Sequence, residues 1–533
     1  MNNHSAYLLK SWAKSPISRR SLLLMAATTA VAGTSLGKAF GVTAPVITQV
    51  LGRPTDTSIA LSVSSSQPIT TFVEYGTSKT RYTSKSTQLQ ISPSSPTVFD
   101  IKGLKAGTKV YYRINYKGTS DTTFANGKQY SFTTARKAGS TFSFSLHGDT
   151  HPERAGKMFN AELYEVTLAN IAAQQPDFHI MVGDDFSIDP IISKGQADQN
   201  GVENIYKTHR NWLNIAASSV PLFLVNGNHE QAAAYLLDGT TNNPAVLAGN
   251  ARLKYFPLPV PDTFYSGDST PIAGVGLPRD YYAWTWGDAL FVTLDPYWHS
   301  KNAVDNVAGV IVPEDQPITN TGTGTGAGGA KNPAGSGGGK KGGATPVATA
   351  PSAPTGNGKV TNLWSIGIGD EQYAWLKKTL EGSKAKYKFV FAHHVMGTGR
   401  GAVEVSTNYE WGGNDPKSQS TFAKERPNWE LPIHDLMVKN KVSIFFQGHD
   451  HIFCTQERDG LIYQSMPNPA DDTFSMFNDE AYKSGTKAPN SGHVRVTVSP
   501  AQAKIEYFLA ARSKDTSRKN LSVAHSYVVK PKA

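Results

Sequence analysis

Residues 442–451 read VSIFFQGHDH, an apolar run that ends in Gly448, His449, Asp450 and His451. Four other places in the chain repeat this pattern, in which carboxylate, amide or imidazole side chains directly follow apolar residues. They lead into Asp149 and His151, Asp184 and Asp185, Asn228 to Glu230, and His393 and His394. In four of the five places a glycine stands just before the polar residues, where the backbone must turn tightly. Because the carboxyl ends of neighbouring strands meet at one edge of a sheet, we expect these side chains to converge.

Apolar segments without polar alternation recur through residues 140–533 and predict the strands of a buried sheet. They lie at 141–146, 178–182, 222–225, 387–391 and 442–446. Segments with helical periodicity alternate with them, at 156–174, 206–216, 371–380 and 431–438, and hairpins are expected at 281–294, 452–466 and 494–509. This alternation predicts an α/β (α+β) layered domain with mixed β-sheets flanked by helices.

Residues 45–136 have a different pattern. Short alternating strands, for example 58–63 and 110–114, follow one another at a spacing of about a dozen residues without a helical stripe. The pattern predicts a small all-β sandwich, and residues 104–113 resemble the turn-and-strand element of fibronectin type III domains. We expect this domain to be a spacer or a docking module.

Residues 321–360 interrupt the α/β pattern with 13 glycines and almost no large apolar side chain. Such a segment buries too little surface to offset the entropy lost on ordering, so we predict a disordered insertion. The alternation of strand and helix resumes at Gly369, which places the insertion inside the domain.

The first 44 residues resemble a twin-arginine export signal, because Arg19 and Arg20 precede an apolar run at 22–36. We expect cleavage between about Ala39 and Ala44, contact with the Tat translocon during export, and a periplasmic or secreted protein. The alternative is a retained membrane anchor, for which the run is short. No other segment reaches spanning length, so the mature chain should have no transmembrane segment.

The net charge bears on a nucleic-acid partner, and the cysteine count limits the kinds of metal site that the chain can form. The net charge of +10 includes five basic residues within 1–45, which leaves 47 basic and 42 acidic residues elsewhere and gives no support for a stable nucleic-acid partner. Cys454 is the single cysteine, which excludes an internal disulfide and a cysteine-based zinc site. A metal must therefore be held by His, Asp, Glu or Asn.

The motifs Asp-x-His, Gly-Asp, Gly-Asn-His-Glu, His and Gly-His-x-His, in that order, resemble those of the calcineurin-like metallophosphoesterase superfamily over about residues 140–530. A β-sandwich ahead of such a domain is similar to the arrangement in purple acid phosphatases. The resemblance implies a two-metal site with Asp184 as the bridge. One metal would take Asp149, His151 and His451, and the other Asn228, His393 and His449. These donors suit Fe, Mn or Zn.

The resemblance also implies a chemistry, the hydrolysis of a small-molecule phosphate ester by a metal-bridging hydroxide that attacks phosphorus. His229 falls where the family places the proton donor to the leaving group, and Glu230 is the expected orienting partner. Arg400 is a candidate for binding the substrate phosphate. We expect a phosphomonoesterase. The alternatives are a phosphodiesterase or nucleotide hydrolase with the same site, and a non-catalytic envelope binding protein with a structural metal.

Several positions keep an alternative or depart from the purple acid phosphatases. His394 competes with His393 as a ligand, and Asp185 with Asp184 as the bridge, while His147 is expected to be structural. Purple acid phosphatases have Gly at the position of His151 and a metal-binding Tyr at the position of Ser187. Because that tyrosinate gives their colour, we predict a colourless enzyme.

Overall fold

The computed structural model describes residues 44–93, 95–300, 302, 363–395, 400–415 and 417–532, and the described residues from Val46 onward form one compact unit. The predicted export signal and the predicted insertion at 321–360 lie outside the described residues, so both stay predictions. Among the described helices, none combines the length and the apolar character needed to cross a membrane.

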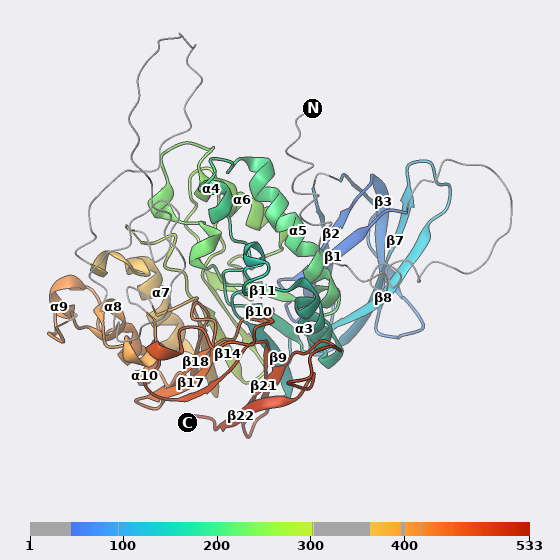
Figure 1. Ribbon diagram of the computed structural model, residues 1–533. Helices are drawn as coiled ribbons and strands as arrows, with labels where there is room; N and C mark the ends of the chain where they lie inside the picture. Colours follow the sequence, from blue (N-terminus) through green and yellow to red (C-terminus); the bar gives the residue numbers. More distant parts are fainter. Residues whose placement is uncertain are drawn as a thin grey trace, which may run out of the picture. The chain divides into compact units, whose positions relative to one another are not determined.

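Two large mixed sheets face each other in the α/β part (Figure 1). The first has nine strands in the order β22-β21-β20-β9-β10-β11-β1-β2-β6, and its centre, β9 to β11, is parallel. Its strands in the α/β part are β9 (Phe142–His147), β10 (Phe178–Met181), β11 (Leu222–Leu224), β20 (Gly492–Val498), β21 (Ala503–Leu509) and β22 (Val523–Val529).

The second sheet has eight strands in the order β12-β13-β14-β15-β16-β18-β17-β19, and β14, β15 and β16 run parallel. Its strands are β12 (Ser266–Gly267), β13 (Tyr282–Trp286), β14 (Ala289–Thr293), β15 (Tyr387–Phe391), β16 (Ile444–Gln447), β17 (Phe453–Arg458), β18 (Leu461–Ser465) and β19 (Thr486–Ala488). Buried aromatic residues such as Phe144 and Phe178 from the first sheet pack against Phe291 and Phe389 from the second. This apolar layer explains why the central strands lack polar alternation.

Helices cover the outer face of each sheet. The longer helices on the first sheet are α3 (Ala161–Gln174), α5 (Gln199–Ala217) and α6 (Pro244–Tyr255), and those on the second are α7 (Gly369–Gly382) and α10 (Ile433–Lys439). Asn160 and Asp198 cap α3 and α5, since each side chain accepts a hydrogen bond from a backbone N–H in the first turn. The short helices are α4 (Asp189–Ile192), α8 (Tyr409–Gly412), α9 (Phe422–Glu425), η1 (Pro152–Arg154), η2 (Asn228–Glu230), η3 (Ala234–Leu236), η4 (Leu363–Ser365), η5 (Ala402–Glu404) and η6 (Asp479–Ala481). The predicted α/β architecture with mixed sheets and flanking helices is therefore confirmed.

The N-terminal β-rich part consists of two packed sheets. Strands β1 (Ile47–Gly52), β2 (Ser58–Ser65) and β6 (Thr97–Lys102) continue the nine-stranded sheet, because β1 pairs in parallel with β11. The other sheet of this part is a separate five-stranded sheet. It contains β3 (Ile69–Gly76), β4 (Ser84–Lys85), β5 (Leu89–Ile91), β7 (Lys109–Gly118) and β8 (Ala125–Thr133). The Tyr112 hydroxyl donates to the carbonyl of Ser218 at the end of α5, which ties this part to the α/β part. The resemblance to fibronectin type III and the boundary at residue 136 stay predictions.

Candidate metal centre

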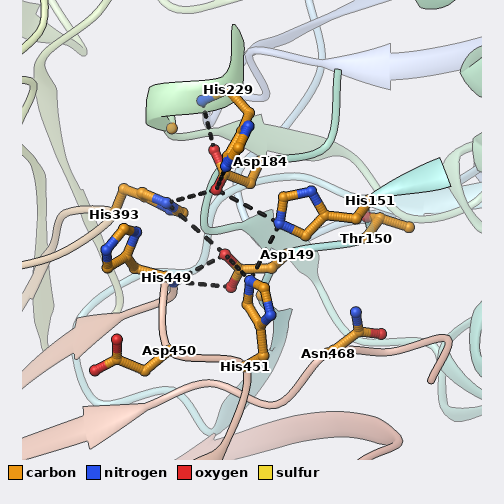
Figure 2. Close-up of polar contacts among 12 residues, drawn as sticks. Asp149, Thr150, His151, Asp184, His229, His393, His449, Asp450, His451 and Asn468 are labelled. Carbon is orange, nitrogen blue, oxygen red and sulfur yellow. Dashed lines mark hydrogen bonds and ion pairs between the residues drawn. The ribbon is translucent and has the colours of Figure 1, made fainter. Parts of the chain in front are cut away.

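The polar ends of five strands converge at one place, as Figure 2 shows for most of their side chains. Strands β9, β10 and β11 of the nine-stranded sheet lead into Asp149, Asp184 and Asn228, and β15 and β16 of the other sheet lead into His393 and His449. His151, His229 and His451 complete the group, and none of these eight residues is more than 7% exposed. The site therefore lies at the carboxyl ends of strands from both sheets.

The turns that carry these ligands have unusual backbone conformations. Asp184 and His449 have φ angles of 59° and 70°, in the left-handed region that non-glycine residues rarely adopt. Gly183 before Asp184 has φ of 94°, and a Cβ there would lie 2.7 Å from His393 Nδ1. Backbone strain of this kind persists where the surrounding structure enforces it, and it gathers at functional sites.

Asp184 lies at the centre of the group. Its Oδ2 is 3.0 Å from His393 Nε2, 3.6 Å from His151 Nε2 and 3.8 Å from His229 Nε2. His151 belongs to one half of the predicted metal pair and His393 to the other, so a single carboxylate faces imidazoles from both halves.

The other predicted ligands lie on the two sides of Asp184, one set for each predicted metal. Asp149 Oδ1 is 3.4 Å from His451 Nε2, and His151 Nε2 is 3.1 Å from His451 Nε2. On the other side, His393 Nε2 is 3.1 Å from Asn228 Oδ1. Three carboxylate–imidazole groups have ligand atoms within 4.8 Å of one another: Asp149, His151 and His451; His151, Asp184 and His229; and Asp184, His393 and His449.

The orientation of two imidazoles fits metal binding. His393 Nδ1 is 2.8 Å from the carbonyl oxygen of Val182, and His151 Nδ1 is 2.8 Å from Glu153 Oε1. With Nδ1 occupied in this way, Nε2 of each ring faces the cluster as a lone-pair donor, which is the usual arrangement of metal-binding histidines. Buried carboxylate, amide and imidazole groups whose ligand atoms crowd together in this way fit one or two transition-metal cations.

The pKa shifts of the clustered histidines show how strongly these buried groups interact. Burial favours the neutral form of His393, but the carboxylates of Asp184 and Asp149 outweigh it and raise the pKa to about 10. Burial and the neighbouring His451 hold the pKa of His151 well below its usual value. Two cations between these groups would replace the protons that the carboxylates attract.

His394 and Asp185, the alternative ligands that the sequence left open, lie outside the cluster. His394 stacks on His449, places Nδ1 3.2 Å from the Tyr297 hydroxyl, and belongs to none of the three groups. Asp185 accepts a hydrogen bond from the Thr150 hydroxyl and also lies outside them. The structure thus brings His393 and Asp184, rather than their neighbours, into the cluster.

His229 lies at the edge of the cluster between two residues that the sequence did not single out. Its Nδ1 is in hydrogen-bond contact with Oδ2 of Asp189, the first residue of α4. Its Nε2 is 3.2 Å from Arg154 Nη2. Burial opposes protonation of His229, but Asp184 and Asp189 raise its pKa to about 9. The sequence offered one signal for Arg154 and Asp189, which is that they lie close to the motifs. Arg154 is three residues after His151, and Asp189 is five residues after Asp184.

Glu230 has a different environment from the one expected of an orienting partner. Its carboxylate accepts hydrogen bonds from the backbone N–H groups of Asp184, Asp185, Phe186 and Gly227, at 2.7 to 3.1 Å. It therefore joins the turns after β10 and β11, and the carboxylate beside the His229 ring is that of Asp189.

The other predicted residues also have defined places. Arg400 Nη1 donates to the carbonyl of His449 at 2.6 Å and to Asp450 Oδ1 at 3.0 Å, so it braces the last motif. His147 is fully buried, with Nδ1 3.0 Å from the Gly148 carbonyl oxygen, and lies outside the three groups. The Ser187 hydroxyl is buried and has no hydrogen-bond partner among the described residues.

Comparison with solved structures identifies the fold. The chain superposes on the structure of PhoD with a TM-score of 0.58 and 14% identity, over 91% of this chain and 90% of that one. It superposes on the purple acid phosphatase PPD1 from yellow lupin (Lupinus luteus) seeds with a TM-score of 0.53 and 14% identity, over 91% of this chain and 74% of that one. No family model and no curated protein matches the chain. The chain therefore shares the fold of PhoD and of this purple acid phosphatase.

Proposed function

We propose that this protein is a metal-dependent phosphoester hydrolase with two cations in its site. The observation that carries the proposal is the position of Asp184, whose carboxylate faces imidazoles of both halves of the cluster. Asp149, His151 and His451 would hold one cation, and Asn228, His393 and His449 the other, with Asp184 shared. Cations bound there would supply an activated water and neutralise charge during an in-line displacement at phosphorus.

His229 is the proposed proton donor to the leaving oxygen. Its ring lies at the rim of the cluster, with Nε2 toward Asp184 and Arg154. The Asp189 carboxylate accepts the Nδ1 proton, which fixes the ring and leaves Nε2 to hold the proton that is transferred. A positioned acid of this kind typically contributes about 10²- to 10⁴-fold in rate.

Arg154 is the proposed contact for the substrate phosphate. Its guanidinium lies 3.2 Å from the His229 ring, so two groups that can both be cationic meet at the rim. A phosphate oxygen that accepts from both would relieve their repulsion, and arginine suits phosphate because its planar fork can donate two parallel bonds. Arg154 also pairs through Nε with Glu153 Oε1 and donates through Nη1 to Met158 Sδ. Its Nη2 faces the His229 ring, whereas Arg400 donates to the His449 carbonyl and to Asp450.

We propose a small phosphate monoester as the substrate, and a diester or nucleotide is the alternative that the assay below separates. The paired arginines at Arg19 and Arg20 support export, and with it action in the periplasm or outside the cell. Iron, manganese and zinc are the candidate metals, because the donors combine carboxylate, amide and imidazole groups.

The test uses protein stripped by a chelator and reconstituted separately with Fe, Mn and Zn. Turnover is measured with 4-nitrophenyl phosphate and with bis(4-nitrophenyl) phosphate, and bound metal is counted by mass spectrometry. On an alkyl phosphate monoester, whose leaving oxygen needs protonation, His229→Ala should keep the metal and lose turnover, while His525→Ala, a control in the edge strand β22, should keep both. Absence of turnover with every metal and both 4-nitrophenyl esters would overturn the proposal, and an unchanged rate on the alkyl ester in His229→Ala would remove His229 from it.

A further inference from the structure

A second group of metal-type ligands lies outside the centre described above. Asp268 follows β12, Asp280 stands just before β13, and His299 comes after β14. One ligand atom from each lies within 4.8 Å of the others. Asp268 and Asp280 are almost fully buried, at 2% and 0% exposure, and His299 is partly buried.

The centre of this group is the Asp280 carboxylate. Its Oδ2 is 2.9 Å from His299 Nε2, and one of its oxygens lies within 4.8 Å of a carboxylate oxygen of Asp268. Its Oδ1 is buried and has no hydrogen-bond partner in the part of the chain that the structure describes. Leaving a buried acceptor without a donor costs free energy, so this oxygen indicates a missing ligand.

Charge leads to the same conclusion. Among the described residues no lysine or arginine forms an ion pair with Asp268 or Asp280, and His299 is the one basic side chain paired with them. Burial, followed by repulsion from Asp280, raises the pKa of Asp268 to about 6. The same two causes raise the pKa of the fully buried Asp295 to about 7. Three buried carboxylates with one imidazole require a further positive charge or a shared proton.

We propose that Asp268, Asp280 and His299 bind a divalent cation at a site separate from the dinuclear centre. Two carboxylates with one imidazole suit Mn²⁺ or Zn²⁺, since oxygen donors favour the first and nitrogen the second. Such a cation would join the segment after β12 to the two ends of the β13–β14 hairpin. Asp295, on which the Asp280 charge acts, accepts a hydrogen bond through Oδ2 from Asn226, two residues before Asn228. This site does not depend on the proposed hydrolase activity.

The experiment counts bound Mn²⁺ after chelation, reconstitution and desalting, in the full-length protein and in an Asp184→Asn background that weakens the dinuclear centre. Asp280→Asn should bind one equivalent less than its parent in both backgrounds. The control is Asp288→Asn, a change in the β13–β14 turn at a carboxylate that pairs with Lys386. This control should keep the metal content of its parent. Because the difference is read within each background, failure of the dinuclear centre does not affect it.

Thermal melting provides a second measurement. In the Asp184→Asn background Mn²⁺ should raise the melting temperature, because a ligand that binds the native state alone stabilises it, and Asp280→Asn should abolish that rise. Equal metal content and an equal melting shift in Asp280→Asn and its parent would overturn the site and leave a proton shared between the carboxylates. If Asp280→Asn does not fold, Asp268→Asn and His299→Gln test the same expectations.

Discussion

Replacement of Asp189 by asparagine tests the proton-donor assignment without removing the donor. The side chain keeps its size, but the negative charge beside His229 Nδ1 is lost. The amide no longer favours the protonated ring and can present its NH₂ group to Nδ1, which favours the wrong tautomer. Asp189 belongs to none of the carboxylate–imidazole groups of the centre, so metal content should stay at the wild-type level.

The magnitude follows from the role of Asp189 as a positioning residue. Loss of an outer carboxylate–histidine contact typically costs about 10- to 100-fold in activity, which is about 1.4 to 2.7 kcal/mol of transition-state stabilisation. Removal of the ring itself in His229→Ala should cost more, about 10²- to 10⁴-fold. We therefore expect His229→Ala to lose more activity than Asp189→Asn.

The assay compares two phosphate monoesters under saturating conditions. A 4-nitrophenyl ester leaves as a stabilised anion that needs little protonation, whereas an alkyl ester needs the donor. Asp189→Asn should therefore lower kcat for the alkyl ester more than for the aryl ester. Asp198→Asn is the control, because Asp198 caps α5 and asparagine caps a helix equally well. An equal loss on both esters, or a loss of metal, would refute the assigned role.

Four further predictions concern other parts of the chain. Arg154→Ala should lower kcat/KM by about tenfold or more, since a charge-assisted bond contributes about 1.5–3 kcal/mol, and an unchanged value would exclude Arg154 as a phosphate contact. Glu230→Gln should lower the free energy of unfolding by about 2 kcal/mol or more in denaturant titrations, because its NH₂ group would face buried N–H donors; wild-type stability would contradict this. The metal-loaded protein should show no intense visible absorption band, since Ser187 stands where a coloured site needs tyrosine. Deletion of 321–360 should leave metal content and turnover close to unchanged, and a large loss of either would show that the segment acts at the site.

The sequence sufficed for the parts of the fold that depend on local pattern. Uninterrupted apolar runs predicted the central strands, since both faces of these strands are buried between the apolar layer and the helices. Gly183 and Gly448 marked the tight turns, because a side chain at either position would collide with the cluster. Polar side chains directly after these glycines, at the ends of apolar runs, could therefore be chosen as candidate ligands from the sequence alone.

The remaining features depend on contacts between distant segments. Asp189 and Glu230 have the same chemical group, and only the folded turns determine that Asp189 faces the His229 ring while Glu230 faces the backbone. The parallel pairing of β1 with β11 joins segments about 170 residues apart, through Gly52 and Leu222, and no local pattern encodes it. The group around Asp280 was missed because its members stand 12 and 19 residues apart, outside any ligand motif, and the β13–β14 hairpin separates Asp280 from His299.

Anomalous X-ray diffraction from crystals loaded with Mn or Zn would show whether two cations share the Asp184 carboxylate. At the dinuclear centre we expect two peaks about 3.5–4 Å apart, one on each side of the Asp184 carboxylate, with His151 and His451 on the first and His393 and Asn228 on the second. A single peak at this position, or two peaks that do not share Asp184, would contradict this expectation.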